Sequence, residues 1–212
     1  MPWPVGESPV AVRRVPVIRM TSTLARVTSL TFGMLACPVA LCGPTERAGS
    51  WLDEPSPASW NEPGLPIPAA PRSDGTIDPR CRALARPPEL DEDKLLRNRG
   101  WDLVGTFQGG WRILVVQGAA GYDGMCRPRQ YQDFVFVRGV FAGTLSPHAM
   151  DSRTDGALTR VTVQSDTRLT AEYARYDATD PLCCPSRITS VVFDIANEAP
   201  LLRPLSASTS KR

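Results

Sequence analysis

The sequence from residue 134 to residue 141 reads Phe-Val-Phe-Val-Arg-Gly-Val-Phe. Two apolar runs flank Arg138 and Gly139, which predicts two strands joined by a short hairpin turn. The first run is apolar at both odd and even positions, whereas a strand with one face in water alternates. We therefore expect a hairpin whose first strand is central in its sheet and covered on both faces.

Further strands are predicted on both sides of this hairpin. Upstream, apolar residues repeat at every second position in segments 101–107 and 111–115, and Gly109-Gly110 between them favours a tight turn. Downstream, segments 161–163 and 169–173 alternate between apolar and polar residues, and in segment 191–195 the apolar residues 191, 193 and 195 alternate with Val192 and Asp194. These three segments are typical of half-buried antiparallel strands. The sequence thus predicts about six or seven strands, which we expect to follow one another as a meander.

One helix is predicted ahead of the strands, within residues 87–100. Pro88 suits a first helical turn, and the acidic run 91–93 complements the positive end of the helix dipole. Arg97 and Arg99 suit the opposite end, and Gly100 is typical of the residue that follows a helix. The predicted fold class is therefore α+β, with one N-terminal helix and a mainly antiparallel sheet in a domain at residues 81–204.

Four cysteines lie in this domain: Cys81, Cys126, Cys183 and Cys184. An even number of cysteines in an exported protein predicts disulfides, here two. Because a bond between adjacent cysteines strains the intervening peptide, we expect Cys81 and Cys126 to be linked separately to the Cys183-Cys184 pair. A zinc or redox site is the weaker interpretation, since the sequence has no C-x-x-C motif.

The N-terminal 42 residues have the order of an export signal. Four arginines precede a short apolar run at residues 27–36, and small residues and cysteines follow. Met34-Leu-Ala-Cys37 resembles a bacterial lipoprotein processing box, so Cys37 is one candidate for lipidation. Cys42 is the other, because a mature chain that begins there retains no odd thiol. Plain secretion is the alternative to a lipid anchor.

Residues 43–80 are rich in proline, serine, alanine and glycine, and they have no periodic apolar pattern. Proline breaks helices and favours extended chain, so we expect a disordered linker between the membrane and the folded domain. The alternative is a proline-rich ligand for a partner's groove, which Trp51 and Trp60 would help to dock. Residues 205–212 are expected to be a flexible tail.

Composition excludes several classes of function. The net charge is only +2, which gives no reason to expect a nucleic-acid partner. No run of eighteen apolar residues is present, which argues against a conventional membrane-spanning helix. His148 is the one histidine, so histidine-rich metal sites are excluded. We expect neither a metal nor a cofactor.

The most polar loop of the domain, residues 147–156, holds the candidate ligand-contact residues: His148, Asp151, Ser152, Arg153 and Asp155. His148, Asp151 and Ser152 could form an acyl-transfer triad, which makes a secreted hydrolase the alternative function. Three neighbours on one loop seldom meet the distances that a triad needs, and no G-x-S-x-G motif is present. A calcium site at Asp151 and Asp155 lacks the loop spacing typical of that ion. We therefore expect a loop that is structural or contacts a ligand.

Two segments carry a family resemblance. Residues 134–147, Phe-Val-Phe-Val-Arg-Gly-Val-Phe-Ala-Gly-Thr-Leu-Ser-Pro, and residues 176–186, Tyr-Asp-Ala-Thr-Asp-Pro-Leu-Cys-Cys-Pro-Ser, resemble core segments of the LppP/LprE family of bacterial lipoproteins. The resemblance extends over residues 101–195. It implies an exported, usually lipid-anchored envelope protein of undefined role, with no catalytic residues to assign. We expect a non-enzymatic domain that binds an envelope protein, a polymer or a small ligand.

Overall fold

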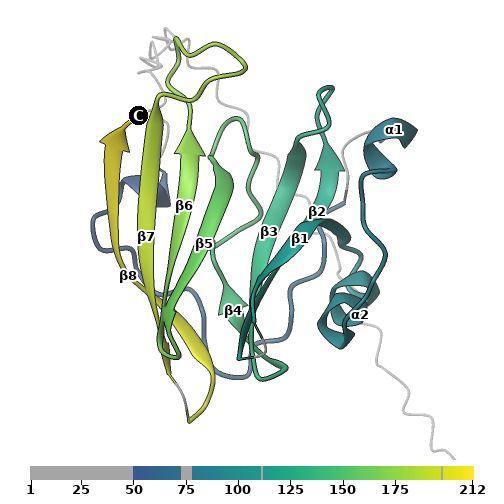
Figure 1. Ribbon diagram of the computed structural model, residues 1–212, viewed down its shortest axis with the longest axis vertical. Helices are drawn as coiled ribbons and strands as arrows, with labels where there is room; N and C mark the ends of the chain where they lie inside the picture. The colour runs from purple at the N-terminus through teal and green to yellow at the C-terminus, as the bar shows by residue number, and fades with distance from the viewer. Residues whose placement is uncertain (1–49, 73–77, 111, 197) are drawn as a thin grey trace, which may run out of the picture. The chain divides into compact units, whose positions relative to one another are not determined.

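Two antiparallel four-stranded sheets form the domain in the computed structural model, which describes residues 50–72, 78–110, 112–196 and 198–212 (Figure 1). The first sheet contains β1 (Asp102–Gly109), β2 (Ile113–Tyr122), β3 (Pro128–Val137) and β4 (Val140–Thr144), in that order. The second contains β5 (Ala157–Ser165), β6 (Arg168–Arg175), β7 (Arg187–Ala196) and β8 (Leu201–Lys211), also in order. Within each sheet, strands that follow one another in the chain pair with each other.

Helices are few and short. They are η1 (Trp51–Asp53), α1 (Pro79–Arg82) and α2 (Asp91–Asn98). The prediction of one helix with a single sheet of six or seven strands is wrong, because the described part of the chain is mostly β and its eight strands form two sheets. The loop at residues 145–156 ends the pairing of the first sheet and begins the second, a break that strand periodicity does not reveal.

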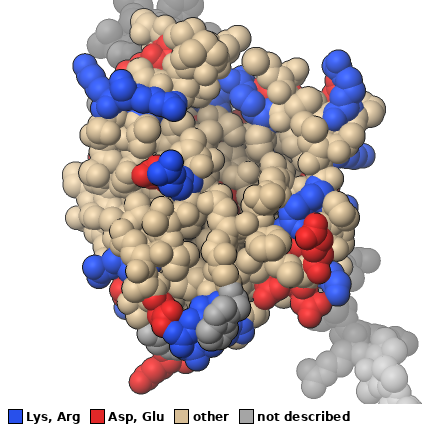
Figure 2. All heavy atoms as spheres, viewed as in Figure 1, with Lys and Arg blue, Asp and Glu red and all other residues tan. Residues whose placement is uncertain are grey.

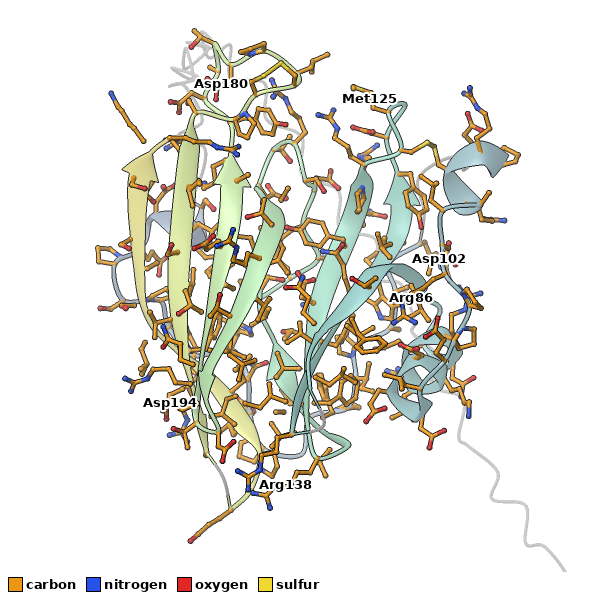
Figure 3. The ribbon with its side chains drawn as sticks, in the orientation of Figure 1. Arg86, Asp102, Met125, Arg138, Asp180 and Asp194 are labelled. Carbon is orange, nitrogen blue, oxygen red and sulfur yellow. A yellow bond between two sulfur atoms is a disulfide. The ribbon has the colours of Figure 1, made fainter. Side chains whose placement is uncertain are left out.

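Both predicted hairpins are present. In the β3–β4 turn, Arg138 and Gly139 have φ of 50° and 79°, the left-handed backbone that suits a two-residue hairpin turn. Figure 3 shows Arg138 at this end of the molecule and Asp180, in the β6–β7 loop, at the opposite end. In the β1–β2 turn, the N–H of Gly110 donates to the carbonyl of Ile113 at 2.8 Å.

The first sheet is covered on both faces. One face of β2 and β3 packs against the second sheet, with Val115 and Val135 among its buried residues. The other face packs under α2 and nearby chain, where Phe134, Phe136 and Leu96 are fully buried. This arrangement confirms the prediction that residues 134–137 form a central, doubly covered strand.

The second sheet is covered on one face. Leu169 and Tyr173 of β6, and Val191 and Phe193 of β7, point into the core between the sheets and are fully buried. The residues that alternate with the inward ones are partly exposed, and most of β5 is exposed. Figure 2 shows that the face in view carries its charges mainly toward its ends. Alternation predicted the inward residues of β6 and β7 correctly.

Residues 50–72, expected to be a disordered linker, lie against the sheets. Trp51 and Leu52 are buried in the core between the sheets, and Ile67 packs in the second cluster under α2. The prolines hold the segment extended, and the apolar residues between them attach it to the domain. The expected flexible tail likewise forms most of β8, which pairs with β7 along its length.

Asn61 of this segment joins the edges of the two sheets. Its Nδ2 donates to the carbonyls of Thr144 on β4 and Leu202 on β8, at 3.0 and 3.1 Å, and its Oδ1 accepts from the N–H of Thr144 at 2.9 Å. Gly143 makes room for this side chain, because a Cβ at Gly143 would lie 2.4 Å from the Asn61 side chain. Position 143 therefore needs glycine.

The disulfide pairing differs from the expectation. Cys81 is bonded to Cys126, with their Cα atoms 4.9 Å apart, and Cys183 is bonded to its neighbour Cys184. The loops that carry the two pairs are joined by a hydrogen bond, since the Arg127 side chain donates to the carbonyl of Leu182 at 3.3 Å. Sequence spacing could not show that α1 rests beside the β2–β3 turn, which brings Cys81 to Cys126.

Candidate ligand-binding site

Two side chains of the predicted contact loop hold it to the first sheet, and a third closes the loop on itself. Asp151 accepts from the N–H of Gln130 at 2.7 Å, and Asp155 accepts from the N–H of Asp151, also at 2.7 Å. The hydroxyl of Ser152 donates to the carbonyl of Pro128 at 2.7 Å. These contacts give Asp151, Ser152 and Asp155 structural roles in closing the loop.

The remaining two predicted residues, His148 and Arg153, line hollows on either side of this loop. His148 is exposed and lines both hollows, whereas Arg153 lines only the more polar one. The hydroxyl proton of Ser152 is engaged by Pro128, and no hydrogen bond joins His148 to Asp151 or Ser152 in the described part of the chain. This geometry gives the triad alternative no support.

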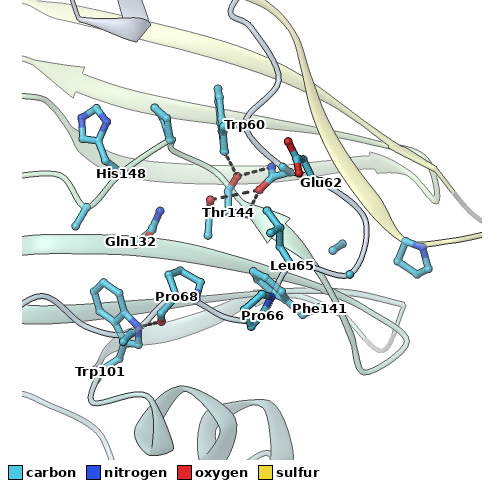
Figure 4. A pocket seen from close by; sticks show the side chains of 18 of the residues that line it. Trp60, Glu62, Leu65, Pro66, Pro68, Trp101, Gln132, Phe141, Thr144 and His148 are labelled. Carbon is cyan, nitrogen blue, oxygen red and sulfur yellow. Dashed lines mark hydrogen bonds between the residues drawn. The ribbon is translucent and has the colours of Figure 1, made fainter. Parts of the chain in front are cut away.

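An apolar pocket of about 480 Å³ lies between the proline-rich segment and the first sheet (Figure 4). Its apolar wall is built mainly from Trp60, Leu65, Pro66, Pro68, Trp101 and Phe141. This volume falls within the range of roughly 300–1,000 Å³ of small-molecule sites, which are also lined predominantly by apolar and aromatic side chains. The pocket therefore has the size and lining of a site for a small apolar ligand.

Hydrogen bonds fix the proline-rich wall at both ends. At one end, Trp60 Nε1 donates to the carbonyl of Thr144 at 3.0 Å, beside the Asn61 bridge. At the other, Trp101 Nε1 donates to the carbonyl of Pro68 at 2.8 Å, and the N–H of Ala70 donates to the carbonyl of Arg99 at 2.8 Å. Both indole contacts appear as dashed lines in Figure 4. The wall is thus positioned without a ligand.

Few polar side chains reach the pocket. The amide of Gln132 is buried and donates to the carbonyl of Ser146 at 3.0 Å, and the hydroxyl of Thr144 donates to the same carbonyl at 2.8 Å. Glu62 and His148 are exposed residues of its lining. Because the buried polar groups already bond to the protein, the interior of the pocket is suited to apolar matter.

The second hollow is a polar cleft of about 700 Å³ between η1, the 145–156 loop and the β6–β7 loop. Arg175 makes a two-point contact with Asp53, at 2.5 and 3.0 Å, and Arg187 pairs with Asp177 at 2.9 Å. The hydrogen bond from Arg175 holds the pKa of Asp53 below its ordinary value. Arg153 lies over the ring of Tyr176, with its guanidinium carbon 3.9 Å from the ring centre.

The pocket and the cleft adjoin. Trp60 lines the pocket and Trp51 lines the cleft, and their rings meet edge to face with centres 5.1 Å apart. His148 belongs to the lining of both. The two hollows are therefore neighbours across a pair of indoles, with an imidazole at their junction.

A titratable group that sequence reasoning missed lies in the core. Asp133 on β3 is 1% exposed; its Oδ1 accepts from Gln117 Nε2 at 2.9 Å, and its Oδ2 has no hydrogen-bond partner among the described residues. Burial raises the pKa of Asp133 to about 7. The only signal in the sequence was a charged residue at an inward position of a doubly covered strand. It lines neither hollow.

Sequence reasoning also missed most of the pocket. The wall belongs to residues 60–71, which composition assigned to a linker, and only the aromatic Trp51 and Trp60 hinted at docking. The lipidation candidates Cys37 and Cys42 lie outside the described residues. Within the described ranges, no helix is long and apolar enough to cross a membrane, and no cluster of His, Cys, Asp or Glu is arranged to hold a metal.

Comparison with known proteins gives one match. Residues 110–198 match the family model of the LppP/LprE lipoproteins, which confirms the predicted resemblance. No curated protein and no solved structure matches the chain. The matched range includes β2 to β7 and the 145–156 loop, whereas the proline-rich wall of the pocket lies outside it.

Proposed function

We propose that the chain is an envelope-associated lipoprotein of unknown role, because residues 110–198 match the LppP/LprE lipoproteins, an uncharacterised family and not a known enzyme family. We propose that it is exported and lipid-anchored, and that its folded domain is a non-enzymatic binding domain. In this proposal the domain holds a small apolar ligand between the proline-rich wall and the first sheet. The observation that carries the proposal is the apolar pocket of about 480 Å³.

The fixed wall supports this function. Residues 60–71 contain little regular structure, yet Trp60, Asn61, Pro68 and Ala70 each hydrogen-bond to distant parts of the chain. A pre-positioned wall reduces the ordering cost that binding would otherwise carry. The small number of free polar groups inside favours an apolar ligand over a sugar or a nucleotide, each of which needs many hydrogen bonds.

Binding is tested with an uncharged naphthylamine dye, whose fluorescence rises in apolar surroundings. We expect the full chain to bind the dye and the L65E variant to bind it about tenfold less tightly. The reason is that a carboxylate in the lining loses apolar contact and must be desolvated, each of which costs on the order of 1–2 kcal/mol.

Leu205→Glu is the matched control for this change. Leu65 and Leu205 are similarly exposed, at 48% and 44%, but Leu205 lies on β8 outside the lining. Equal dye binding by both variants, or no dye binding by the unaltered chain, would refute the binding function. His148→Ala is expected to leave any background esterase activity unchanged.

The anchor is tested separately, by the intact mass of the protein from its native host. We expect acyl mass on a chain that begins at Cys37 or Cys42, and a Cys→Ala change at the modified position should release the protein from the membrane fraction. A chain that retains residues 1–36 and carries no acyl group would contradict the anchor. It would leave the binding function standing.

A further inference from the structure

The cleft beside the pocket is rich in arginine. Its formal charges balance, with Arg153, Arg175 and Arg187 against Asp53, Asp155 and Asp177, so its net charge does not select a ligand. However, not every charged side chain of the cleft belongs to an ion pair. Four of these side chains form two ion pairs, Arg175 with Asp53 and Arg187 with Asp177.

The carboxylate of Asp155 is also engaged, because it accepts from the N–H of Asp151 at 2.7 Å and lies 3.3 Å from the hydroxyl of Thr154. This leaves Arg153 as the cation of the cleft that makes no ion pair in the described part of the chain.

Arg153 is held in place by a backbone carbonyl and an aromatic ring. The pKa of the nearby Asp180 carboxyl is lowered by its hydrogen bond from the N–H of Asp177 and, to a smaller extent, by the charge of Arg153. Arg153 donates from its Nη2 to the carbonyl of Asp180 at 3.1 Å, and its planar head stacks on Tyr176. Its Nη1 is buried and has no hydrogen-bond partner among the described residues. Arg153 thus lines the cleft with a fixed guanidinium that keeps a buried, unused donor, and a guanidinium with unused donors can recognise a carboxylate.

We propose that the pocket and the cleft together bind a single-chain anionic amphiphile, with its alkyl chain in the apolar pocket and its carboxylate at Arg153. This inference rests on the proposed function, because it names the ligand class of the same pocket. The apolar pocket accounts for the chain, and the cleft beyond the Trp51–Trp60 pair accounts for the head. His148, which lines both hollows, lies where the chain meets the head.

The test compares decanoate with decanol as competitors for the naphthylamine dye, at a pH where decanoate is ionised. The two molecules have the same chain length, and decanol is the more apolar. A site that recognises only the chain would therefore prefer decanol. We expect the unaltered full chain to bind decanoate at least about tenfold more tightly than decanol, the size of effect that a hydrogen-bonded charge produces. Acetate, the head without the chain, should not displace the dye.

Two variants test whether Arg153 binds the carboxylate of decanoate. R153Q should lose about tenfold in decanoate affinity, with decanol affinity unchanged. R160Q removes an exposed arginine from β5 and should retain the preference for decanoate. Circular dichroism checks that both variants are folded, and R153K, which keeps the charge without the fork, should lie between R153Q and the unaltered chain.

The outcomes separate the two proposals. Dye binding with decanol preferred, or equal to decanoate, would overturn the anionic ligand and leave the apolar binding function intact. An R153Q variant that keeps the preference would overturn the assignment to Arg153. Absence of dye binding would refute the binding function itself. The decanoate-to-decanol ratio of the unaltered chain decides the ligand class even if R153Q fails to fold.

Discussion

The two sheets have the same number of strands and the same strand order, but they differ in how they are covered. The first is buried on both faces, between the second sheet on one side and α2 with residues 65–70 on the other. The second is buried on one face only. The difference shows where a site can be built. The extra layer does not pack closely against the whole of the first sheet. The apolar pocket lies where the proline-rich segment passes over β4.

The difference between the two sheets should be largest when a large side chain is removed from the doubly covered sheet. Phe134 is fully buried under the extra layer, in edge-to-face contact with Trp101 at 5.1 Å between ring centres. We expect Phe134→Ala to lower the free energy of unfolding by about 3–5 kcal/mol, because it leaves a cavity. Urea unfolding followed by tryptophan fluorescence measures this loss.

Val163→Ala on the second sheet is the matched change. Val163 is 38% exposed, so its truncation should alter the free energy of unfolding by less than about 0.5 kcal/mol. Similar losses for the two variants would show that β5, where Val163 pairs with Leu169, is packed as closely as the first sheet, contrary to the structure.

A second change concerns the core that the two sheets share. Asp133 has a folded-state pKa of about 7 against an ordinary value of 3.8, so its protonated form is favoured by folding. The buried carboxyl therefore lowers the stability of the folded protein at high pH. This loss is absent below pH 3.8, grows as the pH rises from 3.8 to 7, and is constant above 7. The full shift corresponds to roughly 4 kcal/mol. We expect Asp133→Asn to stabilise the protein by about 2–3 kcal/mol at pH 8, since the asparagine amide must also be desolvated.

The gain should disappear near pH 4, where Asp133 is neutral in the folded chain. Thermal unfolding across this pH range provides the measurement. Asp194→Asn, at a partly exposed position of β7, is the control and should show no such gain. A gain for Asp133→Asn that is independent of pH would mean that ionisation of this carboxyl is not its cause.

A third change tests the contacts at the edge where the two sheets meet. Asn61→Ala removes three hydrogen bonds to the backbone of Thr144 and Leu202. It should cost about 2 kcal/mol of stability, because buried backbone groups lose their partner. It should also loosen the proline-rich wall and weaken dye binding. Asn61→Asp, which keeps only the acceptor oxygens, is expected to give a similar loss, and normal dye binding by both variants would show that the wall is held by its other contacts.

Local patterns predicted the elements that depend on neighbours in the chain. Alternation located β6 and β7, the Arg138-Gly139 pair marked a hairpin, and the acidic run located α2, although this helix begins at Asp91 and not near Pro88. Each of these signals acts within a few residues, where propensity and turn chemistry decide the structure.

Features that depend on distant partners could not be predicted. Residues 205–211 are mostly small and polar and follow Pro204, so nothing local indicates a strand; pairing with β7 makes them one. The Cys81–Cys126 bond and the attachment of residues 50–72 likewise need contacts between segments far apart in sequence. The surroundings of the predicted ligand-contact residues could not be predicted for the same reason. His148 and Arg153 line the hollows, but the apolar wall opposite them came from the presumed linker.

The Asn61 bridge has a consequence for hydrogen exchange. The amide proton of Thr144 is bonded to the side chain of Asn61, a residue in the pocket wall, and not to a neighbouring strand. Any opening of the wall that withdraws Asn61 exposes this proton to solvent, while the rest of β4 can stay paired with β3. The rate at which this proton exchanges with deuterium therefore reports how often the wall opens. It can be measured in the unaltered protein, without a label or a substitution.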